Sequence, residues 1–279
     1  MNVIRHDTAA AFLQVAEPLL LNAEAENNLI LGIAQGIARN PAAALDAYLA
    51  TVGSDTNVLA CAVHIAPFKL VITRANREPI VALARDAFDA IPQLTGVTGP
   101  ARSAGDFAME WSRISGLQPT LTMRLRIHET RKVVDSDLPA AQGHFRPASP
   151  SDLPLLAGWT EVFVADARVP EPVDASRVVE DAITRGRLHV WEDAAEPVSM
   201  AAWTGKTPNG VRINFVYTPR ELRGKGYATA CVKALTRQQL GQGNAFCWLY
   251  TDVSSTASPN MFKRIGYWPV SDVAEYNLK

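Results

Sequence analysis

The sequence has few cysteines and no pattern that would bind a metal. It contains three cysteines, Cys61, Cys231 and Cys247. Because the number is odd, they cannot all form disulfides with one another. None lies in a C-x-x-C motif or beside a histidine at zinc spacing. The five histidines show no ligand spacing either, so we expect no metal site. Unpaired cysteines favour a reducing compartment, and we therefore expect a cytoplasmic location.

Long apolar runs and an excess of charge of one sign are also missing. The formal net charge is -1, which provides no basic field for binding nucleic acid or an acidic membrane. The first residues lack the apolar core of a signal peptide. Glu17 and Pro18 interrupt the longest apolar run before it could span a bilayer. These features predict a soluble intracellular protein with neither nucleic-acid nor membrane partners.

The length and composition fit two globular domains. The chain has 279 residues, of which 48% are hydrophobic and 20% are charged, so each half can bury a core of its own. The stretch at about 135–142 contains Pro139 and few large apolar residues, which is typical of a linker. We therefore predict domains at 1–134 and 143–279.

Hydrophobic spacing predicts alternating helices and strands in both halves. In the first half, we expect helices at 9–21, 23–37, 79–90 and 101–114, and strands at 57–64, 68–73, 94–98 and 120–128. In the second half, we expect a helix beginning at 149–152, helices at 175–184, 226–240 and 259–265, and strands at 145–147, 188–192, 198–204, 211–218, 245–252 and 273–278. The order strand, helix, strand, helix, strand at 68–128 recurs at 211–278. This recurrence indicates a divergent internal duplication, with chance alternation of an α+β chain as the alternative.

A glycine-rich turn at 223–229 joins a predicted strand to a predicted helix. Its sequence is Arg-Gly-Lys-Gly-Tyr-Ala-Thr. Such a turn leaves backbone N–H groups in front of the helix, where the helix dipole favours an anion. Gly224 and Gly226 allow the backbone to approach the ligand closely, and Arg223 and Lys225 add positive charge. The sequence therefore predicts a site for a phosphate or pyrophosphate group.

Two common phosphate-binding motifs do not fit this turn. A nucleoside-triphosphate loop requires Ser or Thr directly after the lysine, but Gly226 follows Lys225. A dinucleotide fold requires G-x-G-x-x-G after the first strand, and that pattern is missing.

The segment closely resembles the pyrophosphate loop of the GCN5-related N-acetyltransferase (GNAT) superfamily. The signature of that family is Arg or Gln, two residues, Gly, one residue, then Gly or Ala, and Arg223, Gly226 and Ala228 match it in register. The preceding stretch 216–219 and the closing stretch 264–270 are also typical of the family. The resemblance covers roughly the second half of the chain. The arrangement resembles tandem members that carry a degenerate N-terminal copy.

The resemblance implies a fold, a reaction and partners. The fold would be α/β (α+β), with two GNAT-like domains, each a mixed and mostly antiparallel sheet flanked by helices. The reaction would be transfer of an acetyl group from acetyl-CoA to a primary amine by direct attack in a ternary complex, without a metal. The protein would thus be an acyltransferase for groups other than amino-acyl groups. Its acceptor would be a small-molecule or peptide amine, and its assembly a monomer or a homodimer.

The resemblance also implies which residues contact acetyl-CoA. They form the end of the fourth family strand, the loop, and the short helix that precedes the Gly-aromatic pair. These residues are Phe215, Val216, Tyr217, Thr218, Arg223, Gly224, Lys225, Gly226, Tyr227, Ala228, Thr229, Ser255 and Phe262.

The sequence departs from the family at the proton-transfer groups. The family commonly places a tyrosine where this chain has Phe262, which has no proton to give. Candidates to replace it are Tyr250, Ser254, Ser255 and Ser258. The alternative is that the thiolate leaves without a proton donor, because a thiol pKa of about 8.5 makes it a tolerable leaving group. The family often keeps a glutamate where this chain has Asn214, a poor base. Glu161 and Asp166 could act through water, although surface carboxylates are the commoner interpretation.

Two hypotheses therefore follow from the sequence. The first is an N-acetyltransferase, with Asn214, Tyr250 and Glu161 as candidate catalytic residues. The second is a non-catalytic acyl-CoA-binding or sensing module. A polar cluster at Glu24, Glu26, Asn27 and Asn28 is interpreted as a capped helix end, with a contribution to the acceptor cleft as the alternative.

Overall fold

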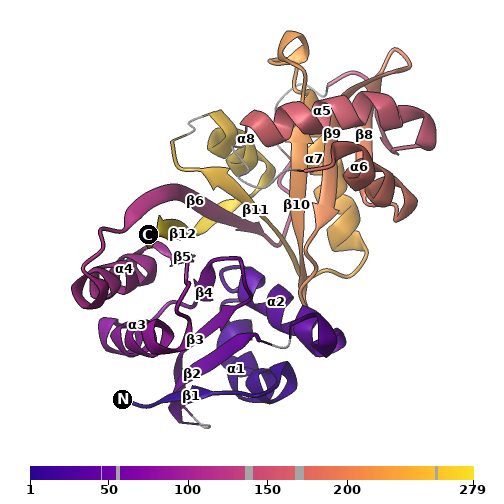
Figure 1. Cartoon of the computed structure of the whole chain (residues 1–279). Helices are drawn as coiled ribbons and strands as arrows, with labels where there is room; N and C mark the ends of the chain where they lie inside the picture. The colour runs from indigo at the N-terminus through magenta and orange to yellow at the C-terminus, as the bar shows by residue number, and fades with distance from the viewer. Residues whose placement is uncertain (45, 55–56, 136–140, 167–172, 255–256) are drawn as a thin grey trace. The chain divides into compact units, whose positions relative to one another are not determined.

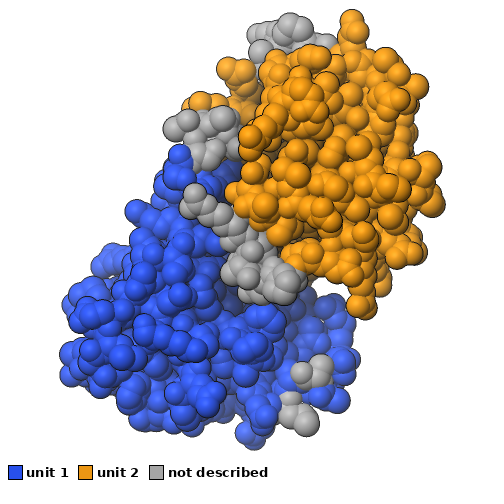
Figure 2. Space-filling model, turned by 45° about the horizontal axis from the view of Figure 1, so that its top comes forward, with its two compact units in different colours: residues 1–127, 250–255, 269–279 blue, residues 128–249, 256–268 orange. Residues whose placement is uncertain are grey.

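The computed structural model contains two compact units, which are drawn in different colours in Figure 2. The structure describes the chain apart from residues 45, 55–56, 136–140, 167–172 and 255–256. Unit 1 comprises residues 1–127, 250–255 and 269–279. Unit 2 comprises residues 128–249 and 256–268. Most of the predicted linker lies outside the described residues, so the domain boundary at 135–142 stays a prediction.

Unit 1 is built on a sheet with the strand order β1-β2-β3-β4-β5-β12-β6 (Figure 1). Its strands are β1 (Val3–Arg5), β2 (Tyr48–Ser54), β3 (Asn57–His64), β4 (Leu70–Ile72), β5 (Gly96–Pro100), β12 (Trp268–Asn277) and β6 (Thr120–Thr130). Its helices are α1 (Ala9–Asn22), α2 (Asn28–Arg39), α3 (Arg77–Ala90) and α4 (Ala101–Ser115), with a short 3-10 turn η1 (Pro41–Ala43).

Alternation along the strands of unit 1 separates two cores. On β3, Cys61 and Val63 belong to the core that α1 and α2 cover, whereas Ala60 and Ala62 belong to the core beneath α3 and α4. Successive side chains of a strand point to opposite faces, so a strand that is apolar on both faces must be covered on both. Unit 1 is therefore a sheet between two layers of helices.

Unit 2 repeats this layering on the strands β11-β10-β9-β8-β7. These strands are β7 (His144–Pro147), β8 (Leu188–Asp193), β9 (Glu196–Thr204), β10 (Gly210–Tyr217) and β11 (Phe246–Asp252), whose end belongs to unit 1. The helices are α5 (Leu153–Asp166), α6 (Ala175–Thr184), α7 (Tyr227–Gly241) and α8 (Ala257–Ile265), with 3-10 turns η2 (Pro150–Asp152) and η3 (Arg220–Leu222). On β9, Met200 and Ala202 pack with α5 and α6, while Ala201 packs with α7 and α8.

The same order of elements occurs in both halves of the chain. β4, α3, β5, α4 and β6 follow one another as β10, α7, β11, α8 and β12 do. In each series the first two strands are parallel neighbours, Leu70 facing Val97 in one and Val211 facing Cys247 in the other. The other strand pairs with a described register are antiparallel. The predicted fold class, mixed and mostly antiparallel sheets flanked by helices, is confirmed.

Strand β12 completes the sheet of unit 1, although it follows the elements of unit 2 in the chain. It pairs antiparallel with β5 from Val273 opposite Pro100 to Asn277 opposite Gly96. Two ion pairs fix its register: Lys69 contacts Glu275 with a 2.6 Å Nζ–Oε2 distance, and Arg126 contacts Asp272. Leu278, directly after the strand, is buried in the core under α3 and α4. Residues from both halves of the sequence therefore build one sheet.

Two strands, one strand boundary and one helix boundary differ from the sequence-based expectations. The strand expected at 273–278 begins at Trp268. β1 and β2 were not predicted, because the buried part of β2 has no polar alternation and contains alanine and glycine. The helix expected from residue 23 begins at Asn28. Asn27 donates from Nδ2 to the carbonyl of Leu20 at 3.1 Å, so the polar cluster forms a junction between α1 and α2.

No helix in the described parts of the chain has the length and apolar character required to cross a membrane.

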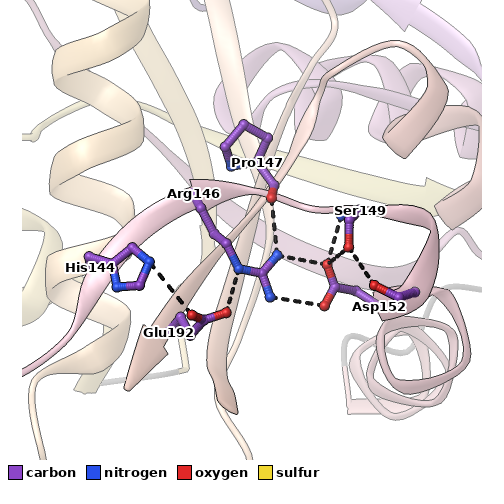
Figure 3. A network of polar contacts seen from close by, with 7 residues as sticks. His144, Arg146, Pro147, Ser149, Asp152 and Glu192 are labelled. Carbon is purple, nitrogen blue, oxygen red and sulfur yellow. Dashed lines mark hydrogen bonds and ion pairs between the residues drawn. The ribbon is translucent and has the colours of Figure 1, made fainter. Parts of the chain in front are cut away.

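An ionic network in unit 2 ties β7 and β8 to the start of α5 (Figure 3). The guanidinium of Arg146 donates from Nη1 and Nη2 to the Asp152 carboxylate, at 2.8 and 3.0 Å, and from Nε to Glu192. Asp152 also accepts from the backbone and hydroxyl of Ser149, forming a capping box. The buried Asp152 therefore accepts four hydrogen bonds, and its pairing with Arg146 lowers its pKa to about 2.

We expect Asp152→Asn to lower the free energy of unfolding by about 2–3 kcal/mol at pH 7, because it leaves the half-buried Arg146 partly unpaired. The folded-state pKa of Asp152 is below its unfolded value, so this stabilisation is present above about pH 4 and is lost as pH falls towards 2. Urea unfolding of both proteins between pH 7 and 3 measures the difference. A difference that stayed constant down to pH 3 would contradict the assignment.

Candidate coenzyme site

Strand β10 carries a β-bulge before the glycine-rich loop. It pairs with β9 as far as Asn214 opposite Ala202, and the register then shifts until Tyr217 faces Met200. Two residues of β10 therefore oppose one of β9. Phe215 has a φ of 50°, an uncommon value for a residue with a side chain. Its ring packs against Phe163 of α5 at 5.4 Å between centroids, which holds the bulge in place.

Strands β10 and β11 stay paired for only part of their length. The parallel register runs from Gly210 opposite Phe246 to Arg212 opposite Trp248. Among the described residues, no further pair joins the two strands, although β10 continues to Tyr217. The edge of β10 from Ile213 onward therefore has no partner strand on that side. An exposed strand edge of this kind can hydrogen-bond an extended ligand.

The loop after β10 presents an uncapped helix N-terminus. Gly224 and Gly226 have φ values of +83° and +85°, which a residue with a Cβ rarely adopts. Gly226 is the N-cap of α7 and offers no side-chain cap. The backbone N–H groups of residues 224–229 have no hydrogen-bond acceptor among the described residues. These orphan donors, aligned with the dipole of a 15-residue helix, form an anion-binding nest.

The two basic residues of the loop differ in their contacts. Arg223 donates from Nε to the carbonyl of Thr218 at 3.0 Å, and its guanidinium lies 5.9 Å from the Tyr217 ring. It also lies 4.0 Å from Asp166, whose other oxygen is 3.9 Å from Arg220. Lys225 is exposed and makes no contact among the described residues. Arg223 therefore braces the loop, and Lys225 is available to a ligand.

Two other residues of the predicted coenzyme set, Tyr227 and Thr218, have their side chains engaged in the fold. The Tyr227 hydroxyl donates to Asp193 Oδ2 at 2.6 Å, which anchors the start of α7 to β8. Thr218 donates to the hydroxyl of the buried Ser199, which in turn donates to the carbonyl of Tyr217. The structure thus adds Asp193 and Ser199 as supports of the loop. Nothing in the sequence identified them, because they lie 34 and 19 residues from their partners.

Apart from Phe262, the remaining described candidates of the coenzyme set lie in the bulge of β10 and at the start of α7. Phe215 and Val216 occupy the bulge, and Ala228 and Thr229 form the first turn of α7. Ser255 lies outside the described residues.

The candidate catalytic residues lie on three different elements. Asn214 is half-buried on β10 opposite Ala202, so strand pairing places it on the face covered by α5 and α6. Its side chain makes no hydrogen bond among the described residues. Glu161 is exposed on α5. Tyr250 lies on β11 in unit 1, where its hydroxyl accepts from Asn28 Nδ2 at 2.7 Å.

The contact between Asn28 and Tyr250 connects the polar cluster of the first half to strand β11. Asn28 also donates to the carbonyl of Ala25 at 2.7 Å, so its amide is fixed at the start of α2.

Phe262 is buried rather than presented to a ligand. It is 6% exposed and packs in the core under α7 and α8, with its ring 5.9 Å from that of Tyr267. Cys231 and Cys247 lie in the same core. Burial raises the pKa of the Cys247 thiol to about 12, so it stays protonated at neutral pH. No group of three metal-ligating side chains occurs in the described ranges.

Comparison with known proteins bears on this site. Residues 156–267, which contain the bulge, the loop and α7, match the model of the acetyltransferase (GNAT) family. No curated protein matches the sequence.

Three solved structures share the fold over nearly the whole chain. A GNAT-family acetyltransferase from Colwellia psychrerythraea has a TM-score of 0.61 at 10% identity, covering 100% of both chains. A GCN5-related N-acetyltransferase from Sphaerobacter thermophilus has a TM-score of 0.60 at 17% identity, covering 99% of this chain and 96% of that one. A Drosophila protein has a TM-score of 0.64 at 10% identity, covering 99% of this chain and 98% of that one. At these identities the likeness concerns the fold.

Proposed function

Because residues 156–267 form an acetyltransferase domain of the GNAT family, we propose that the protein transfers the acetyl group of acetyl-CoA to a primary amine. One observation carries the proposal: the N–H groups of residues 224–229 have no acceptor among the described residues and face out of an uncapped helix. A pyrophosphate supplies oxygens for several such donors at once. The exposed Lys225 adds a cation at the same place.

The unpaired edge of β10 would bind the remainder of the coenzyme. Backbone groups from Ile213 to Tyr217 can hydrogen-bond an extended pantetheine arm as a neighbouring strand would. A backbone N–H near Val216, freed by the bulge, would polarise the acetyl carbonyl. When the amine attacks the thioester, the C–S bond breaks and the thiolate leaves. The thiolate is a good leaving group, because the pKa of its thiol is about 8.5. The chain's main contribution is therefore positioning.

We assign proton transfer to two side chains, Glu161 and Tyr250, and orientation of the amine to a third, Asn214. Glu161, exposed on α5, would accept the proton of the attacking amine through water. Asn214, whose amide is unoccupied, would orient that amine by hydrogen bonding. Tyr250 would protonate the leaving thiolate, with its hydroxyl oriented by Asn28. Asp166 is less suited to act as a base, because it faces the arginines of the loop.

A panel of amines distinguishes this function from its alternative. We expect thiol release from acetyl-CoA to depend on at least one primary amine in a panel of amino acids, amino sugars, polyamines and peptides. The alternative is a non-catalytic acyl-CoA-binding module, which is favoured by the buried Phe262 at the usual position of the proton donor. Tight binding of acetyl-CoA without thiol release on any acceptor would support the alternative.

We expect Tyr250→Phe to lower kcat about tenfold to a hundredfold with little change in the KM for acetyl-CoA, since it removes only a proton donor. Steady-state kinetics between pH 6 and 9 measure the decrease in kcat. With amines that react so slowly that their attack limits the rate, the decrease in kcat should be smaller, because protonation of the thiolate then follows the slow step. Tyr276→Phe on β12 is the matched control and should leave kcat unchanged. Equal kcat values for wild type and Tyr250→Phe would remove Tyr250 from the mechanism.

A further inference from the structure

A cavity of about 880 Å³ lies within unit 1, whereas the glycine-rich loop belongs to unit 2. It opens where β4 and β5 end, beside the first turns of α3 and α4 and the start of β12. Its size is within the range of small-molecule sites, which is about 300–1,000 Å³. Seven polar side chains define its chemistry: Arg74, Asn76, Arg102, Ser103, Arg126, Ser271 and Asp272.

Two helices begin at this cavity without side-chain caps. α3 follows Asn76 and α4 follows Pro100, and neither residue makes a side-chain cap hydrogen bond. α4 has 15 residues and no acidic side chain in its first turn. Its first N–H groups find no acceptor among the described residues. The cavity is therefore lined by orphan donors and by the positive end of the α4 dipole, whereas the first turn of α3 contains the carboxylate of Glu78.

Ser103 provides a buried donor at the same wall. Ser103 is only 1% exposed. Its hydroxyl oxygen accepts a hydrogen bond from the backbone N–H of Ala75 at 3.1 Å. The hydroxyl proton has no acceptor within the described parts of the chain. A buried hydroxyl normally has partners for both roles, so the cavity wall presents a donor without an acceptor.

The arginines give the cavity an excess of positive charge. Arg102 is exposed and makes no ion pair or hydrogen bond with described residues. Arg74 is paired with Glu26 and Arg126 with Asp272, but only through their Nε and Nη2 atoms. Nη1 of each remains without a partner among the described residues. Three guanidinium groups thus face a lining that contains one carboxylate, that of Asp272.

We propose that this cavity binds a small molecule through a phosphate or diphosphate group. Guanidinium groups, a hydroxyl donor and helix N-terminal N–H groups all donate hydrogen bonds, and a phosphate accepts several at once. The cavity is larger than a phosphate, so the ligand carries further atoms that fill it. This site is separate from the coenzyme loop, and it does not depend on the proposed transfer reaction.

The experiment measures pyrophosphate binding by calorimetry to the full chain carrying Gly226→Val, which disables the loop of unit 2. We expect one site per chain. Arg102→Ala in that background should weaken binding about tenfold or more, because a charge-assisted hydrogen bond contributes about 1.5–3 kcal/mol. Arg102 has no hydrogen-bond or ion-pair partner in the part of the chain that the structure describes, so its replacement should leave the melting temperature unchanged.

Arg77→Ala is the matched control, because Arg77 is also exposed at a helix start but lies outside the cavity lining. It should leave pyrophosphate affinity unchanged. Ser103→Ala should also weaken binding, by the loss of one donor. No binding to the Gly226→Val protein, or equal affinity in the Arg102→Ala and Arg77→Ala variants, would overturn the proposal.

Two further titrations of the Gly226→Val protein distinguish the source of the phosphate. If CoA displaces pyrophosphate, and Arg102→Ala weakens the binding of both by the same factor, the ligand is a coenzyme-like diphosphate. If CoA does not compete while simple phosphate esters do, the ligand is a smaller metabolite. Both results support the site, since each requires Arg102.

Discussion

Gly226→Val is expected to weaken acetyl-CoA binding at least a hundredfold, about 3 kcal/mol, while the protein stays folded. Gly226 has a φ of +85°, so any side chain there is strained by about 1–2 kcal/mol. Among the described residues, a Cβ at this position would meet only the Ala141 Cβ, at 3.8 Å, which is an ordinary contact distance. The side chain would instead occupy the space in front of the orphan N–H groups. Calorimetric titration with acetyl-CoA measures the loss.

Gly186→Val separates backbone strain from loss of the ligand site. Gly186 has a φ of +62°, and an added Cβ would meet nothing within 4 Å. It lies between α6 and β8, remote in sequence from the loop. Both variants should lower the melting temperature by a similar few degrees, but Gly186→Val should bind acetyl-CoA normally. Normal affinity in a folded Gly226→Val protein would mean that the loop is not the pyrophosphate site.

Removal of residues 269–279, which deletes most of β12, is expected to unfold unit 1. The truncation would expose the edge of β5 over five paired residues and uncover the core around Leu278. It would also leave Lys69 and Arg126 without the carboxylates of Glu275 and Asp272. These losses exceed several kcal/mol, which is comparable with the whole stability of a domain, about 5–15 kcal/mol. Circular dichroism and limited proteolysis followed by mass spectrometry would locate the unfolded region.

Two milder changes make this result quantitative. Leu278→Ala should lower the free energy of unfolding by about 2–4 kcal/mol, because the side chain is fully buried. Trp268→Ala, at an exposed position of the same strand, should have little effect. A synthetic peptide of residues 268–279 should restore protease resistance to the truncated chain. A truncated protein that resisted proteolysis without the peptide would contradict the role of β12.

Local patterns predicted most of the elements but not the partner strands. The amphipathic spacing of α6 and the alternation of β8 depend on neighbours in sequence, and both elements were found where expected. β2 has buried residues on both faces and therefore lacks alternation. The position of β12 beside β5 depends on contacts between residues about 170 apart, which no local pattern encodes.

The candidate site was predictable where backbone geometry follows from residue type. Gly224 and Gly226 indicated a loop whose backbone can approach a ligand closely, and both have positive φ values. The bulge at Phe215 was not predictable, because a positive φ in a phenylalanine is imposed by packing against α5. The contact between Asn28 and Tyr250 joins residues 222 positions apart. For proton-transfer groups in particular, sequence identified candidates, and only tertiary contacts identify their partners.

The placement of β12 also affects how the protein is made. Synthesis proceeds at about 5–20 residues per second, so β5 is complete roughly ten to thirty seconds before the segment that pairs with it. During that interval, the edge of β5 and the core under α3 and α4 are exposed on the growing chain. Unit 1 therefore cannot fold completely as its first 127 residues emerge from the ribosome, and a nascent chain of that length is a suitable ligand for chaperones.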